Sequence, residues 1–83
     1  MKAEELLPDA VNAMQFGGVT VRKGSVGAFI ANARLLAASD ATAEARALAQ
    51  SDLLALVPAL RAIGLFEVLE VRDPWLRELV EAG

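Results

Sequence analysis

Residues 19–29 read VTVRKGSVGAF, and this stretch predicts a strand, a tight turn and the start of a helix. Valines alternate with polar side chains over residues 19–23, which is typical of a half-buried strand. Gly24 ends the strand. Ser25 is expected to cap the next helix, because a serine hydroxyl can accept a hydrogen bond from an amide of the first turn.

The helix that follows, at about residues 25–38, is expected to be the central helix of the fold. Asn32 and Arg34 are its only clearly polar side chains. A helix that is apolar nearly all round is buried on several sides, so we expect this one to lie between the sheet and other helices or at a subunit interface. Its expected core face consists of Val26, Phe29, Ile30, Ala33 and Leu36.

Four further segments complete the predicted order of elements. Residues 3–15 favour a helix that the two following glycines would end. An alanine-rich helical region over 42–63 contains Pro58, where we expect a kink or a break. β-branched and aromatic residues predict a second strand over 65–72. The Asp-Pro pair at 73–74 predicts a short C-terminal helix, with aspartate as the cap and proline in the first turn.

The predicted fold is a small single α+β domain over residues 1–83, in the order α-β-α-α-β-α, with two short strands covered by about four helices. Two strands alone make a marginal sheet, so helices must cover the pair or a dimer axis must extend it. A chain of this length hides only about 60% of its unfolded surface on folding. Because 55% of the residues are apolar, some apolar surface is left outside, and a homo-oligomer would bury it.

Composition excludes many catalytic sites. The chain has no cysteine and no histidine, which excludes thiolate nucleophiles, cysteine-ligated metals and histidine-based triads. Asp40 and Glu44 lie where a helix dipole favours acids, and Glu67 and Glu70 would point to opposite faces of a strand, so neither pair indicates a metal site. We therefore expect no enzymatic activity, no cofactor and no bound metal.

The termini and the apolar runs predict a cytoplasmic protein that does not contact a membrane. Residues 1–10 are acidic and lack the long apolar core of a secretory signal. No apolar stretch reaches the roughly 18 residues that a membrane span needs. The net charge of −3 argues against a general nucleic-acid binder, since no basic field attracts the phosphates.

The charge distribution nevertheless indicates one candidate anion site. Residues 10–39 contain no carboxylate but include three cations, Arg22, Lys23 and Arg34. Backbone amides at a helix N-terminus, beside two cations and small residues, are suited to a phosphate or carboxylate. A phosphate-bearing ligand, a nucleotide or RNA is therefore an alternative to protein association. The residues of this predicted site are Arg22, Lys23, Gly24, Ser25 and Gly27.

The pattern of this turn is not a P-loop, because its lysine precedes the first glycine. Its Gly-x-x-Gly spacing is similar to the loop of RNA-binding KH modules, although that loop joins two helices and this one joins a strand to a helix. The other interpretation is an ordinary connection. In that case Gly24 forms the turn, Ser25 caps the helix, and Gly27 lets the helix approach the sheet closely.

A second alternative starts from residues 18–57, where VTVR precedes two helices. This order loosely resembles a ribbon-helix-helix DNA-binding unit, which implies that Thr20 and Arg22 would enter the major groove from a dimeric ribbon. The chain departs from that pattern in its leading helix, its further strand and its C-terminal helix. It also lacks additional cations to hold phosphates.

The interpretation that fits most of the sequence is a small non-enzymatic domain that associates with itself or with a protein partner. Asn32 is a polar amide on an almost wholly apolar helix, and if buried it must find partners there or across an interface. Trp75 is expected in the core or as an anchor for a partner. The predicted interface residues are Ala28, Asn32, Leu35 and Trp75.

Overall fold

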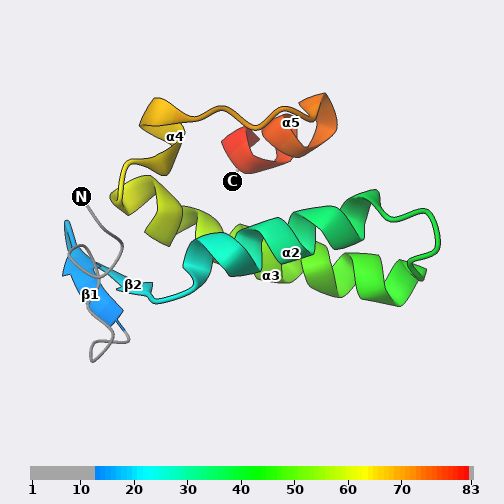
Figure 1. Ribbon diagram of the computed structural model, residues 1–83, viewed down its shortest axis with the longest axis horizontal. Coiled ribbons are helices and arrows are strands. Elements are labelled where there is room, and N and C mark those ends of the chain that lie inside the picture. Colours follow the sequence, from blue (N-terminus) through cyan, green and yellow to red (C-terminus); the bar gives the residue numbers. More distant parts are fainter. Residues whose placement is uncertain (1–12, 83) are drawn as a thin grey trace.

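A β-hairpin, a pair of packed helices and a C-terminal layer follow one another along the chain (Figure 1). The computed structural model describes residues 13–82. The two antiparallel strands and the four helices of this part confirm the predicted α+β class. The elements are β1 (Ala13–Phe16), β2 (Val19–Arg22), α2 (Ser25–Ala37), α3 (Ala43–Ala62), α4 (Leu65–Val68) and α5 (Pro74–Ala82).

The hairpin places one strand where the sequence predicted a helix. β1 pairs antiparallel with β2, with Phe16 opposite Val19. Gly17 and Gly18 form the two-residue turn, and both have positive φ, at 54° and 83°. Such a turn matches the twist of a hairpin, so this glycine pair connects two strands and does not end a helix. The predicted helix over 3–15 is therefore wrong for residues 13–15, and its remainder lies outside the described residues.

The predicted strand over 19–23 and the helix over 25–38 are confirmed, but Ser25 does not cap the helix. Gly24, with φ at 88°, occupies the N-cap position. The buried hydroxyl of Ser25 instead donates a hydrogen bond to the carbonyl oxygen of Arg22, at 2.7 Å. Gly27 also differs from expectation, because a Cβ at this position would meet nothing within 4 Å. No close approach to the sheet requires a glycine there.

The most buried helix is α3, and not α2 as the composition indicated. α3 contributes Ala49, Leu53, Val57 and Leu60 to the core, whereas the only buried residues of α2 are Ser25 and Phe29. Hydrophobic side chains of α2 and α5 pack against this face of α3, and β2 also lies against α3. α2, which is apolar nearly all round, therefore has more surface facing water than its sequence predicts.

α3 continues through Pro58, so the predicted break is absent. The proline lies on the exposed side of the helix. Its ring and the unpaired carbonyl one turn earlier can therefore face water, while the opposite side of α3 packs in the core. The N-terminus of α3 is capped by Thr42, whose Oγ1 accepts from the amide of Ala45 at 3.1 Å.

The predicted strand over 65–72 is wrong. Residues 65–68 form the short helix α4, and residues 69–73 form an extended connection to α5. Gly64, with φ at 85°, lets the chain turn after α3 and begin a helix again at once. Phe66 then contacts Phe29 edge to face, with ring centroids 5.9 Å apart. Neither strand of the described part pairs with this segment, so its β propensity is overridden by packing on α2.

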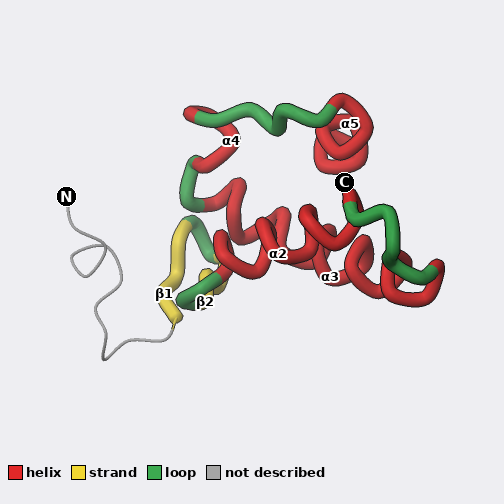
Figure 2. Tube along the Cα trace, turned by 45° about the vertical axis from the view of Figure 1, so that its right-hand side comes forward, coloured by secondary structure: helices red, strands yellow, loops and turns green. Residues whose placement is uncertain are grey.

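The predicted start of the C-terminal helix is confirmed. Asp73 Oδ1 accepts a hydrogen bond from the amide of Leu76 at 2.9 Å, and Pro74 is the first residue of α5. Leu76 and Val80 are buried, and Arg61 Nη2 donates to the carbonyl oxygen of Val80 at 2.7 Å. α4, the connection and α5 thus form a layer over α2 and α3, as the second view also shows (Figure 2).

Replacing Asp73 with alanine should lower the free energy of unfolding by about 1 kcal/mol, because the first turn of α5 loses its side-chain cap. Urea denaturation followed by circular dichroism measures this difference. Asp52→Ala is the matched control, since Asp52 is exposed in the interior of α3 and no cap is removed there. Equal losses in the two variants would contradict a capping role for Asp73.

Candidate protein-binding groove

Two hollows lie in line along one side of α2, between this helix and the layer formed by α4, the connection and α5. The larger has a volume of about 200 Å³ and the smaller about 80 Å³. Together they are named the α2 groove. The α2 side of the groove consists of Val26, Phe29, Ile30, Ala33, Leu36 and Ala37. Of these, Val26, Ile30, Ala33 and Ala37 are four, three and four residues apart, so they form one stripe along the helix. The opposite side consists of Leu65, Phe66, Leu69, Val71, Trp75 and Leu76.

Large apolar side chains of the groove face water. Val26 and Ile30 on α2 are 39% and 50% exposed, and Leu69 and Trp75 across the groove are 58% and 54% exposed. Single exposed apolar residues are ordinary on a protein surface, whereas a contiguous patch marks an interaction site. The apolar stripe and the opposite wall form such a patch along about three turns of α2.

The charged side chains that line the groove are acidic and lie on the side opposite α2. Arg34 is exposed on α2, one turn after Ile30, and has no ion-pair partner within residues 13–82. On the opposite side, Glu70 lines the larger hollow and Asp73 the smaller. Glu70 Oε1 also accepts from Arg77 Nη1 at 2.7 Å. The connection between α4 and α5 therefore gives the groove an acidic edge, whereas Arg34 lines neither hollow.

The predicted interface residues do not form one patch. Trp75 lines the groove and is exposed, so its predicted place in the core is wrong. Ala28 and Leu35 are exposed, but at about 100° per residue they lie roughly 180° around α2 from the stripe in the groove. Asn32 is half-buried between the packed side of α2 and the side that carries Ala28. The structure thus separates Trp75 from the other three residues.

The residues that make the groove are not the ones that the sequence predicted for an interface, apart from Trp75. Val26 and Ile30 were predicted in the core face of α2, but only Phe29 of that predicted face is buried. Leu69 was assigned to a strand. A signal was present, because a helix with so few polar residues cannot turn a polar face to water on any side. The sequence could not show which side the layer of α4 and α5 leaves open.

The predicted anion-site residues lie together at the turn between β2 and α2. Arg22, Lys23 and Gly24 are exposed there, but the Ser25 hydroxyl is already bonded to the Arg22 carbonyl oxygen. None of these residues lines the larger hollow of the α2 groove, although the neighbouring Val26 does. Anion binding at this turn stays a prediction.

The exposed side of the hairpin carries the residues that the ribbon-helix-helix alternative would use. Thr20 and Arg22 are exposed on β2, and Thr20 Oγ1 accepts from Gln15 Nε2 of β1 at 2.7 Å. β2 therefore pairs with a strand of its own chain. In the DNA-binding unit that it resembles, the ribbon would form across a dimer. The hairpin departs from that arrangement, and DNA binding stays a prediction.

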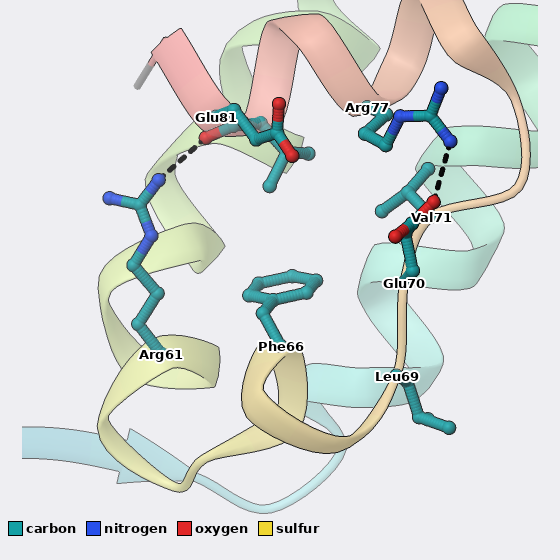
Figure 3. Close-up of a pocket in the computed structure, with 8 residues that line it drawn as sticks. Arg61, Phe66, Leu69, Glu70, Val71, Arg77 and Glu81 are labelled. Atoms are coloured by element: carbon teal, nitrogen blue, oxygen red, sulfur yellow. Dashed lines mark hydrogen bonds and ion pairs between the residues drawn. The ribbon is translucent and has the colours of Figure 1, made fainter.

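Another cleft of about 200 Å³ lies between the end of α3, the connection and α5 (Figure 3), and it shares Phe66, Leu69, Glu70 and Val71 with the larger hollow of the groove. Phe66 stands in its middle, with Arg61 and Arg77 on opposite sides. Both guanidinium groups donate hydrogen bonds within the chain, Arg61 to the Val80 carbonyl oxygen and Arg77 to Glu70. These contacts hold α5 and the connection in place, so they support the opposite side of the α2 groove.

The described residues contain no cluster of three or more acidic side chains that could hold a metal ion. Within the same part of the chain, no helix is both long and apolar enough to cross a membrane. Comparisons with protein-family models, curated proteins and solved structures find no match to this chain. The geometry of its own surface is therefore the basis for an assignment.

Proposed function

We propose that this protein has no enzymatic activity and acts by binding another protein chain through the α2 groove. The observation that carries the proposal is the continuous apolar stripe from Val26 to Ala37 on α2, open to water and faced by Leu69 and Trp75. Full burial of a large apolar side chain contributes about 1.5–3 kcal/mol, so covering the exposed halves of four such side chains contributes on the order of 1 kcal/mol each.

The shape of the groove favours a helix as the bound element. The stripe spans eleven residue steps of α2, or roughly 16 Å at about 1.5 Å per residue, which is the length of about three helical turns. An amphipathic helix presents apolar residues at the same spacing and can lie along such a groove. Trp75 at its edge is of the residue type that most often anchors protein interfaces.

Site-specific photo-crosslinking tests this proposal. Trp75 is replaced by the photoreactive aromatic residue p-benzoylphenylalanine, which has a similar size, and the protein is irradiated in the cells that produce it. We expect protein adducts of defined mass. Mass spectrometry then identifies the crosslinked peptide in each adduct. An added Ile30→Arg substitution should abolish them, because it places a charge in the apolar stripe.

The matched control places the same photoreactive residue at Leu48, which is exposed on α3 and does not line the groove. This control should give no adduct that depends on Ile30. If position 75 yields no protein adduct, or if its adducts persist with Ile30→Arg, the α2 groove is not a binding surface and the proposal is wrong.

A further inference from the structure

We propose that the occupant of the α2 groove is a cationic amphipathic helix of another protein, with two lysine or arginine side chains seven residues apart beside its apolar stripe. This inference rests on the proposed function, since it names the partner of the same groove. The charges that line the groove and the spacing between them carry it.

Both charged side chains that line the groove are carboxylates. Glu70 lines the larger hollow and Asp73 the smaller, and among the described residues no lysine or arginine lines either one. The layer that forms this wall is acidic as a whole. Residues 65–82 carry five carboxylates and two guanidinium groups, a net charge of −3. A bound helix with acids beside its apolar stripe would meet like charges here, whereas one with cations meets opposite charges.

The two carboxylates are placed to accept from a bound cation. The Glu70 side chain is 75% exposed, although its Oε1 accepts from Arg77 Nη1 at 2.7 Å. Arg77 lines the cleft of Figure 3 and not the groove, so it approaches this carboxylate from outside the groove. A carboxylate has about four lone-pair sites, so a second donor can bind Glu70 from the groove side. Asp73 is also exposed, and its Oδ1 accepts from a neutral partner, the amide of Leu76.

The carboxylates follow the groove with the spacing of two helical turns. The connection between α4 and α5 runs along α2 in the same direction as that helix (Figure 1). On α2, the residues of the smaller hollow each lie seven positions after a residue of the larger one, at 33, 36 and 37 after 26, 29 and 30. Seven helical steps advance roughly 10 Å. The three steps of extended chain from Glu70 to Asp73 also span at most about 10 Å.

A helix that lies in this groove can match the same interval. Its residues seven positions apart lie on one side and two turns apart, so its apolar stripe reaches both hollows in step with α2. One flank of that stripe then faces the connection. Cations at two positions seven apart on this flank come level with Glu70 and Asp73, and each can form a charge-assisted hydrogen bond there.

Fluorescence anisotropy with three synthetic peptides tests the charge of the occupant. The peptides share one stripe of leucines and are about 18 residues long, so that each forms a helix in isolation. They differ at two positions seven apart on one flank, which are both lysine, both glutamine or both glutamate. An exposed ion pair typically changes affinity about 2- to 5-fold. We therefore expect the Kd to rise from the lysine to the glutamine to the glutamate peptide, by about 20-fold overall.

Variants of the protein locate this preference at the groove. Glu70→Gln should reduce the ratio of the glutamate to the lysine Kd to about 5, and Glu70→Lys should reduce it to about 1, because one peptide position then favours glutamate. Asp52→Lys is the matched control. It changes the net charge as Glu70→Lys does, but Asp52 is exposed on α3 and lines neither hollow, so the ratio should stay unchanged. Ile30→Arg should weaken binding of the lysine peptide more than about 50-fold.

Three results would overturn the cationic occupant. The first is an equal Kd for the three peptides, or tighter binding of the glutamate peptide. The second is a ratio that Asp52→Lys lowers as much as Glu70→Lys does, because the preference would then reflect net charge alone. The third is no binding of the lysine peptide at about 1 mM. Circular dichroism and urea denaturation of every variant confirm that the fold is retained.

Crosslinking at position 75 separates this inference from the proposed function. We expect the crosslinked segment of the partner to be a cationic amphipathic helix. If the adducts depend on Ile30 but the crosslinked segment is acidic or uncharged, the proposed function stands and the cationic occupant is wrong. Adducts that contain only this protein, within one chain or between two copies, would mean that the protein fills its own groove, which also overturns the inference.

Discussion

Replacing Leu53 with alanine should lower the free energy of unfolding by about 3 kcal/mol. Leu53 is fully buried on the core face of α3, at 0% exposure. Truncation removes three carbon atoms from the core and leaves a cavity that the surrounding side chains fill only in part, which typically costs 2–5 kcal/mol. For a domain of this size the expected fall in Tm is roughly 15 °C. Urea and thermal denaturation at one fixed protein concentration measure both quantities.

Leu48→Ala is the matched control in the same helix. Leu48 is 64% exposed, so its truncation removes little buried surface, and alanine favours the helix slightly more than leucine does. We expect a change within about 0.5 kcal/mol. A similar loss in both variants would mean that Leu48 is also buried in solution, which would place a second contact surface on α3.

The parts of the fold that the sequence predicted correctly depend on neighbouring residues. The alternation in VTVR, the turn at Gly24 and the Asp73 cap each involve a few consecutive positions, and local hydrogen bonding decides them. The segment at 65–72 was wrong because β propensity measures how side chains fit a sheet that must already exist. No strand of the described residues lies beside this segment, and Phe66 packs on Phe29 instead.

The glycine pair after β1 shows the limit of a local pattern. Two glycines after an apolar stretch are typical of a helix end and also of a two-residue hairpin turn. The choice between them depends on whether the preceding residues have a strand to pair with, and β2 provides one. The same ambiguity affected Ser25, since a serine after a glycine can cap a helix or bond backward to the strand, as it does here.

The candidate site was only half predictable. The low polarity of α2 indicated an association surface, and the proposal keeps that interpretation. The face was not predictable, because it depends on where the chain returns after α3. Gly64 directs α4 back over α2, and Phe66 fixes it at Phe29. These long-range contacts leave Val26 and Ile30 open beside the C-terminal layer and separate them from Ala28 and Leu35.

Replacing Pro58 with alanine should raise the free energy of unfolding by about 2 kcal/mol. Proline in a helix interior costs roughly 3 kcal/mol relative to alanine, since it removes a backbone donor and its ring crowds the preceding turn. Part of this gain is offset, by about 0.4–1 kcal/mol, because proline also restricts the unfolded chain. Pro58 is exposed, so its replacement leaves the core face of α3 unchanged.

Ala55→Gly supplies the control, because Ala55 is an exposed alanine of the same helix. It should lose about 1 kcal/mol, which would show that helix propensity on this face of α3 contributes to the measured stability. If Ala55→Gly behaves as expected and Pro58→Ala is destabilising, the proline has a positive role. The backbone adjustment at Pro58 would then be needed to place Leu60 in the core and Arg61 at the Val80 carbonyl oxygen, and thereby to hold α5 at the edge of the α2 groove.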